Sequence, residues 1–189
     1  MSGHGFHVHG PHDHEVEHAA HGSDIFSSKI AVMTAVLATV GAVFGYMAGD
    51  TQNNAALFKN NAAIKKTEAS NQWNYYQAKS NKQNLAELAM TLPGVDTEKY
   101  KGEVTRYKGE KEGIKKDAEK LEAVSVDWDK KSDEQMHQHH RWAQAMTAEQ
   151  IAISLAAITL LTRKKWLEYA AYSVAGVGVA LGVLAWLHF

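Results

Sequence analysis

The stretch of sequence that decides the fold is residues 100–146, YKGEVTRYKGEKEGIKKDAEKLEAVSVDWDKKSDEQMHQHHRWAQAM. Every third and then fourth residue along it selects one continuous face: Tyr100, Val104, Tyr107, Lys111, Ile114, Ala118, Leu121, Ser125, Trp128, Ser132, Gln135, His139, Trp142 and Met146. This spacing continues for more than six heptads without a slip. It therefore predicts one long helix that packs along a coiled-coil seam and then runs into apolar sequence.

The distribution of charge indicates a membrane protein, although the formal net charge is only -1. Residues 30–48, 151–162 and 169–189 carry no Asp, Glu, Lys or Arg, while the segment between the first two is crowded with charge. A bilayer core of about 30 Å needs about 20 apolar residues in a helix. We therefore expect transmembrane helices at 29–49, 142–162 and 166–189.

Residues 50–141 between the first two membrane helices are predicted to form a long antiparallel helical hairpin. Its tip is expected near residues 93–96, because Pro93 disfavours helix at the preceding residue and Gly94 permits a turn. Asp96 or Thr97 can cap the next helix. The fold class is thus all-α, with three membrane helices and a coiled-coil-like hairpin, preceded by a histidine-rich tail at 1–28.

The ascending arm of the hairpin offers two stripes for packing. One 3-4 seam comprises Leu57, Asn60, Ile64, Thr67, Asn71, Asn74, Ala78, Asn81, Leu85, Leu88 and Leu92, and the other stripe comprises Phe58, Ala62, Ala69, Trp73, Tyr76 and Ser80. Buried Asn in such a seam lowers stability but specifies register and partner number. Two stripes on one helix predict contacts on two sides. The interface within the hairpin is expected to use Trp73, Tyr76, Tyr107, Ile114, Leu121 and Trp128.

One block in this arm resembles the signature of a bacterial family of membrane proteins of unknown function. The block is Gln72-Trp73-Asn74-Tyr75-Tyr76-Gln77-Ala78-Lys79-Ser80. Family members combine it with a His/Glu-rich N-terminus, an early membrane helix, a charged helical stretch and apolar C-terminal segments. The resemblance covers essentially the whole chain. It implies an inner-membrane protein and transfers no activity.

Small residues recur four apart in each predicted membrane helix: Gly41, Gly45 and Gly49 in the first, Ala148, Ala152 and Ala156 in the second, Gly178 and Gly182 in the third. Such faces let helix backbones approach closely in lipid. They predict a homo-oligomer or a subunit of a larger membrane complex. Glu149 is expected near the outer end of its helix, where its carboxylate reaches water; deep burial would instead mark a functional site.

Two groups of histidines are candidate metal ligands. Seven fall in the N-terminal tail, at His4, His7, His9, His12, His14, His18 and His21, and the pair His137 and His140 lies one turn apart in the descending arm. Imidazoles interleaved with carboxylates bind Zn, Ni or Cu ions. The alternative for the N-terminal histidines is a solvated tail whose affinity for metal ions has no physiological role.

Several function classes are disfavoured by the sequence. Cysteine is absent, which excludes disulfides and thiolate chemistry, and neither a nucleotide-binding loop nor a nucleophile motif is present. Lys and Arg nearly balance Asp and Glu across residues 49–141, so nucleic acid is not an expected partner. We expect a non-catalytic membrane scaffold or accessory subunit, with a metal-handling membrane protein as the alternative.

The orientation is predicted from the loop between the last two membrane helices. Arg163, Lys164 and Lys165 place that loop on the cytoplasmic side of the bacterial inner membrane. The N-terminus would then be cytoplasmic and the hairpin at 50–141 periplasmic.

Overall fold

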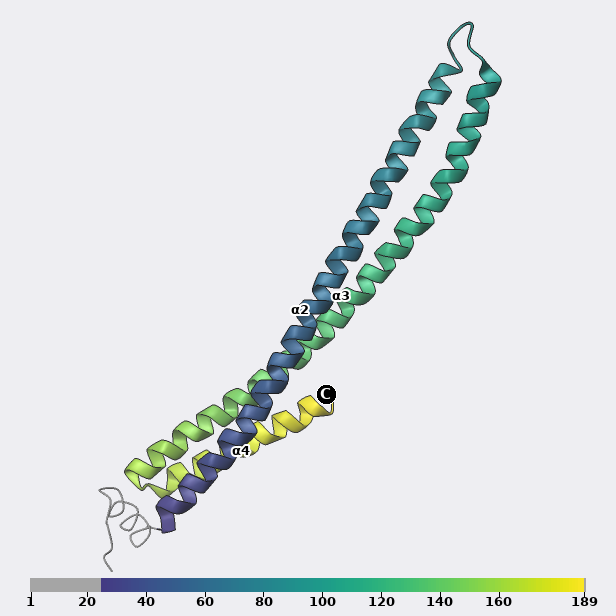
Figure 1. Cartoon of the computed structure of the whole chain (residues 1–189). Helices are drawn as coiled ribbons and strands as arrows, with labels where there is room; N and C mark the ends of the chain where they lie inside the picture. Colours follow the sequence, from purple (N-terminus) through teal and green to yellow (C-terminus); the bar gives the residue numbers. More distant parts are fainter. Residues whose placement is uncertain (1–24, 189) are drawn as a thin grey trace, which may run out of the picture. The chain divides into compact units, whose positions relative to one another are not determined.

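The computed structural model describes residues 25–188, and within this range the fold is entirely helical. Helix α2 spans Ile25–Ala89, α3 spans Thr97–Thr162 and α4 spans Lys165–Trp186 (Figure 1). The predicted all-α class is therefore confirmed for the described residues. The N-terminal histidines lie outside this range.

The break between α2 and α3 has the chemistry that the sequence predicts. Gly94 has a φ of +79°, a left-handed conformation that glycine adopts without steric cost. The side chain of Asp96 caps α3, because its Oδ1 accepts a hydrogen bond from the backbone N–H of Lys99 at 3.2 Å. The helix ends at Ala89, so Leu92 lies in the turn rather than in the helix.

The chain divides into two compact units, which are described separately. Residues 49–139 form the first, here called the hairpin. The described residues 25–48 and 140–188 form the second, here called the three-helix unit. Both α2 and α3 contribute to each unit, since neither helix is interrupted at the boundary.

Inside the hairpin, α2 and α3 run side by side (Figure 1), and the predicted face of α3 packs against α2. Every member of that face within residues 100–139 is buried or half-buried. Opposite it, α2 buries the small residues Ala55, Ala62 and Ala69. Buried hydroxyls join the arms, with Ser125 Oγ donating to the Ala62 carbonyl and Ser132 Oγ to the Ala55 carbonyl, both at 2.8 Å. The predicted seam of α3 is thus confirmed as the packed face.

The packed face of α2 is the second of the two predicted stripes. Phe58 lies against Trp128 with ring centroids 5.3 Å apart, and Ala62 and Ala69 are buried. The 3-4 seam that begins at Leu57 lies on the exposed side. The physical reason is close approach of the two backbones: Ala55 and Ala62 face the small residues Ser132 and Ser125, whose hydroxyls reach the backbone of α2. Leu or Ile at the alanine positions would hold the helices apart and break these contacts.

In the three-helix unit, two buried clusters of apolar side chains join α2, α3 and α4. One buried cluster comprises Ile30, Met33, Leu37, Ala152, Ala156, Ala171 and Ala175. A second joins Ala48, Trp142 and Ala185. All three helices are long and apolar enough to cross a membrane by length and composition.

The glycine and alanine faces of this unit pack against the chain's own helices. A Cβ at Gly41 would lie 3.5 Å from Glu149 Cβ, and one at Gly45 would lie 3.0 Å from Met146 Sδ. A Cβ at Gly182 would collide with the Phe44 ring. Among the described residues, no atom lies within 4 Å of a Cβ built at Gly49. Gly41, Gly45, Gly178 and Gly182 thus pack within one chain, and the assembly of copies through these faces stays a prediction.

Candidate functional site

The exposed face of α2 in the hairpin is a candidate interaction surface. We call it the outer seam; its members are Leu57, Asn60, Ile64, Thr67, Asn71, Asn74, Ala78, Asn81, Leu85 and Leu88, all of them exposed. Leu57 is 54% exposed, Leu85 65% and Leu88 60%. A 3-4 repeat of this length, about 46 Å at 1.5 Å per residue, has the geometry of a helix-packing surface.

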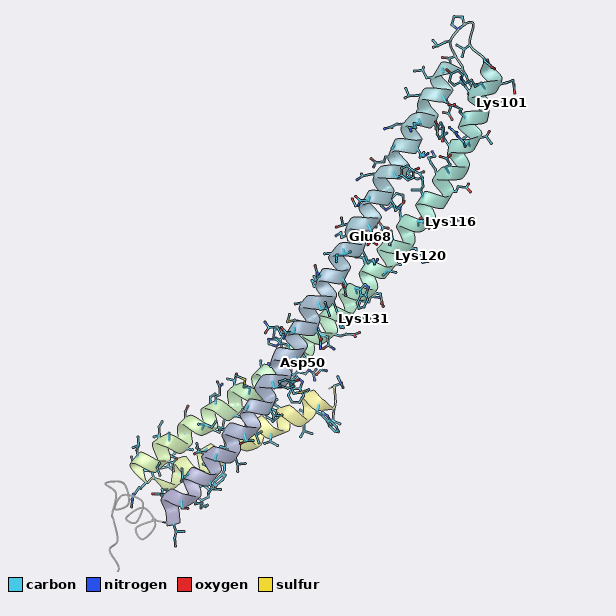
Figure 2. The ribbon with its side chains drawn as sticks, in the orientation of Figure 1. Asp50, Glu68, Lys101, Lys116, Lys120 and Lys131 are labelled. Atoms are coloured by element: carbon cyan, nitrogen blue, oxygen red, sulfur yellow. The ribbon has the colours of Figure 1, made fainter. Side chains whose placement is uncertain are left out.

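The outer seam differs chemically from the outer face of α3. None of its members is charged, whereas the side of α3 that points away from α2 carries Lys101, Lys116 and Lys120 (Figure 2). A solvated helix face is normally rich in charge, as α3 is. The outer seam is therefore an uncharged strip on a helix that also exposes Lys59, Lys66 and Lys82, and the strip itself has the low charge of an interface.

The arrangement of polar residues along the outer seam is also specific. Leu and Ile stand at its two ends, and Asn71, Asn74 and Asn81 occupy its middle. A carboxamide both donates and accepts hydrogen bonds, so an asparagine can pair with a second asparagine. This pattern fits a partner helix that has the same residues and packs in register with α2.

The block at residues 72–80 contributes to both sides of α2. Trp73 Nε1 donates to Glu122 Oε1 at 2.8 Å, and the Trp73 and Tyr76 rings meet edge to face with centroids 5.7 Å apart. Asn74 and Ala78 point outward and belong to the outer seam. Trp73 and Tyr76 therefore join α2 to α3, through Glu122 and Lys111 respectively, while Asn74 and Ala78 are exposed.

Lys79 forms the most enclosed ion pair of the hairpin among the described residues. Its Nζ lies 2.5 Å from Glu110 Oε2, and it also sits over the rings of Tyr75 and Tyr107 at 5.2 and 5.6 Å from the centroids. The hydrogen bond from Lys79 lowers the pKa of the Glu110 carboxyl, and the same bond raises the pKa of Lys79. Each partner therefore stabilises the charged form of the other.

The shifted pKa values predict how this pair depends on pH. The Glu110 pKa is depressed, so its stabilisation of the hairpin is present above the unfolded-state pKa of about 4.3 and disappears as the pH falls through the lower folded value. The Lys79 contribution is present below a pH of about 10.4, and it disappears as the pH rises through the higher pKa of the folded state.

Thermal unfolding of the full chain in detergent tests this pH dependence. At pH 7 the midpoint temperature of the wild type should be higher than that of Glu110→Gln, and the difference between the two midpoints should shrink in acid. Glu119→Gln is the control, because Glu119 is half-exposed and its oxygen lies 3.7 Å from Lys115 Nζ; an equal acid dependence in both variants would contradict the prediction.

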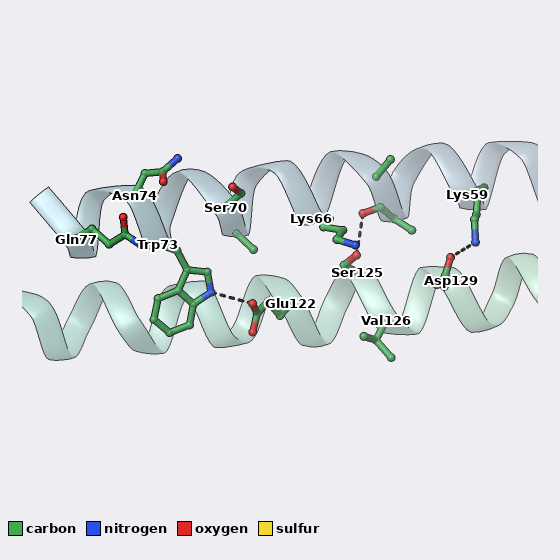
Figure 3. A pocket seen from close by; sticks show the side chains of 13 residues that line it. Lys59, Lys66, Ser70, Trp73, Asn74, Gln77, Glu122, Ser125, Val126 and Asp129 are labelled. Atoms are coloured by element: carbon green, nitrogen blue, oxygen red, sulfur yellow. Dashed lines mark hydrogen bonds and ion pairs between the residues drawn. The ribbon is translucent and has the colours of Figure 1, made fainter.

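A groove of about 810 Å³ runs along one side of the hairpin, with Ala62, Ala69 and Ser125 among the residues that line it. Figure 3 shows Trp73 pointing across it to Glu122 and Lys59 pointing to Asp129. The Lys59 Nζ–Asp129 Oδ1 distance is 2.5 Å. These polar groups are therefore already used to join the arms, and the groove results from the small residues of the inner face.

The predicted metal ligands do not form a site within residues 25–188. No group of three or more His, Asp or Glu side chains with metal-binding geometry occurs in that range. His137 and His140 are both exposed on α3. The seven N-terminal histidines, His4 to His21, lie outside the described residues.

Glu149 departs from its prediction. It was expected to reach water, yet its residue exposure is 0% within the three-helix unit. Sequence reasoning located the residue but not its burial, because the glycines that enclose it lie on two other helices.

These features define a class of all-helical protein with three helices apolar enough to cross a membrane and a long polar hairpin between the first two. The family model described as a domain of unknown function, DUF4337, matches residues 26–188. The chain therefore belongs to this family. No curated protein and no solved structure gives a significant match.

Proposed function

We propose that the chain is a non-catalytic, membrane-anchored scaffold whose copies associate through the outer seam of the hairpin. The observation that carries the proposal is that ten uncharged positions at 3-4 spacing lie exposed on α2, while the inner stripe is occupied by α3. A surface of this kind is normally covered in a native protein. If the chain is instead a subunit of a larger membrane complex, a helix of another protein would cover the outer seam.

Membrane anchoring is supported by the apolar lengths of the helices and by the residues that flank them. Trp142 and Trp166 stand at ends of apolar segments, where tryptophan favours the membrane–water interface. Arg163, Lys164 and Lys165 favour a cytoplasmic position for their loop. We accordingly place the hairpin on the periplasmic side of a bacterial inner membrane.

A second copy of the chain is the partner that best fits the outer seam. Copies inserted with the same orientation have α2 helices that run in the same direction. In a parallel, in-register pair, each position faces its own counterpart, so Ile64 meets Ile64 and Asn71 meets Asn71. No apolar residue is then placed against an amide, and every buried amide has a complementary amide.

The packing of the membrane helices supports the same location for the interface. The faces of Gly41, Gly178 and Gly182 contact side chains of their own chain. Close approach between copies through these faces would require the intramolecular contacts to be given up. The hairpin needs no such exchange, because its outer seam is exposed in the single chain.

Cysteine cross-linking in native membranes tests the proposal, and the absence of natural cysteine makes each introduced thiol unique. Ile64→Cys and Leu85→Cys should give a disulfide-linked dimer on mild oxidation, because in-register positions bring equivalent Cβ atoms within disulfide reach. Lys116→Cys, on the charged outer face of α3, is the matched exposed control and should remain monomeric. Equal cross-linking at Lys116 and Ile64 would indicate random collision and contradict the assignment.

A foreign partner would give a different result in the same experiment. The cysteine variants would then remain monomeric with a zero-length oxidant, while a cross-linker of defined length would attach Ile64→Cys to a chain of another mass. That result would overturn self-association and retain the outer seam as the interface.

A further inference from the structure

The strongest remaining feature is the carboxyl group of Glu149 in the three-helix unit. The residue has an exposure of 0%, and neither Oε1 nor Oε2 has a hydrogen-bond partner among the described residues. Buried polar groups in proteins are almost always hydrogen-bonded, and buried charges are almost always paired. An enclosed carboxyl with two unused oxygens therefore points to a ligand.

The walls around this carboxyl are apolar. From α4, a Cβ built at Gly178 would lie 2.6 Å from Glu149 Oε1, so the absence of a side chain there provides the space that the carboxyl occupies. From α2, Gly41 packs against the stem of the side chain, its Cβ position 3.5 Å from Glu149 Cβ. Two glycines on two helices thus shape the enclosure.

No second charge is available within the segments that face Glu149. Residues 30–45 of α2 and 173–187 of α4 contain no titratable side chain, and Glu149 is the only one in residues 142–162 of α3. Tyr46, the next titratable residue on α2, is 73% exposed and so is directed away from the interior. Lys29 and Glu168 are paired with each other at 2.6 Å. Within the described residues, the carboxyl has no partner that would hold it as an anion.

We infer that Glu149 is a proton-binding site inside the membrane-spanning unit. A metal cation such as Na⁺ or Ca²⁺ requires several oxygen ligands, and Ca²⁺ takes six to eight. Here one carboxyl supplies only two oxygens, and Gly41 and Gly178, which pack against this side chain, add no side-chain oxygen. A proton needs a single oxygen, so it is the cation that this site can bind. Binding is simple association: the carboxylate takes up H⁺ and releases it when the enclosure reaches water.

The inference rests on the membrane location proposed above but not on pairing of the hairpins. Extraction of membranes with alkaline carbonate tests that location by itself, since an integral protein stays in the pellet. Loss of the protein to the supernatant would overturn the proposed function. A protein that stays in the membrane but lacks the proton site would overturn only the present inference.

Labelling with dicyclohexylcarbodiimide, an apolar reagent that reacts with protonated carboxyls, tests the site in the full chain in native membranes. Peptide mass spectrometry should find the adduct on Glu149 at neutral pH, and labelling should fall about tenfold for each pH unit above the midpoint, as expected for one titrating group. Glu168, which is held by Lys29, is the internal control and should remain unlabelled. Glu149→Gln preserves the side-chain shape and should remove the adduct.

Two outcomes would overturn the inference. Absence of labelling at Glu149 throughout about pH 5 to pH 8, in protein that remains in the membrane, would mean that a partner's cation holds the carboxylate. Protection of Glu149 by Na⁺ at constant pH and ionic strength would mean that the site takes a metal cation instead. Labelling of the wild type decides the question even if Glu149→Gln fails to fold.

Discussion

Replacement of Ala118 by aspartate is expected to open the hairpin over several turns. Ala118 is 0% exposed in the packed face of α3, so a carboxylate there would be taken out of water. Burying an unpaired charge disfavours the closed hairpin by an amount on the order of 3 kcal/mol or more. Hydrogen-exchange mass spectrometry of the full chain should show faster amide exchange in the turns of α3 around Ala118 and in the turns of α2 that face them.

Ala123→Asp is the matched control for this prediction. Ala123 lies on the same helix and is exposed, so the same chemical change there costs only helix propensity, less than about 1 kcal/mol. The difference between the two variants isolates burial from propensity. Equal exchange in both variants would mean that α2 and α3 do not pack along this face.

The packed face of α3 is predictable from sequence because its period does not depend on the partner. Large apolar residues such as Tyr107, Ile114 and Trp128 recur at 3-4 spacing, and only one side of the helix can collect them. The turn is equally local, since Gly94 and Asp96 act through their own backbone and first-turn hydrogen bonds. Sequence suffices wherever the determining interactions lie within a few residues.

The face of α2 that packs inward could not be chosen in this way. Both of its stripes satisfy a helical period, and the decision rests on how the volumes of α2 side chains fit those of α3. Ala62 and Ala69 are less apolar than Leu57 and Ile64, yet they are the buried residues, because small side chains let α2 approach Ser125 of α3 closely enough for a hydrogen bond. The enclosure of Glu149 has the same origin, because it requires Gly41 and Gly178 from two other helices.

The remaining large effect is expected at the outer seam, where the double substitution Leu85→Glu and Leu88→Glu should abolish association of copies. These leucines are 65% and 60% exposed in the single chain, so the change leaves the hairpin intact. In a parallel pair the new carboxylates would face each other, and the burial of leucine, about 1.5–3 kcal/mol each, would be lost. A loss of at least about 2.8 kcal/mol raises the dissociation constant roughly 100-fold. Sedimentation or native mass spectrometry in detergent measures this shift.

Ala86→Glu separates the two faces of α2, because Ala86 lies between the same two leucines and is only 3% exposed. This variant should expose the hairpin amides to exchange, since its carboxylate enters the face that packs on α3. The double variant Leu85→Glu, Leu88→Glu should have the opposite effect: dimers should be lost, while amide hydrogen exchange in the hairpin should not change. If the leucine variant instead keeps its dimers, the association of copies does not use the outer seam. The contact between chains would then have to lie in the three-helix unit, at the cost of the glycine contacts that now hold that unit together.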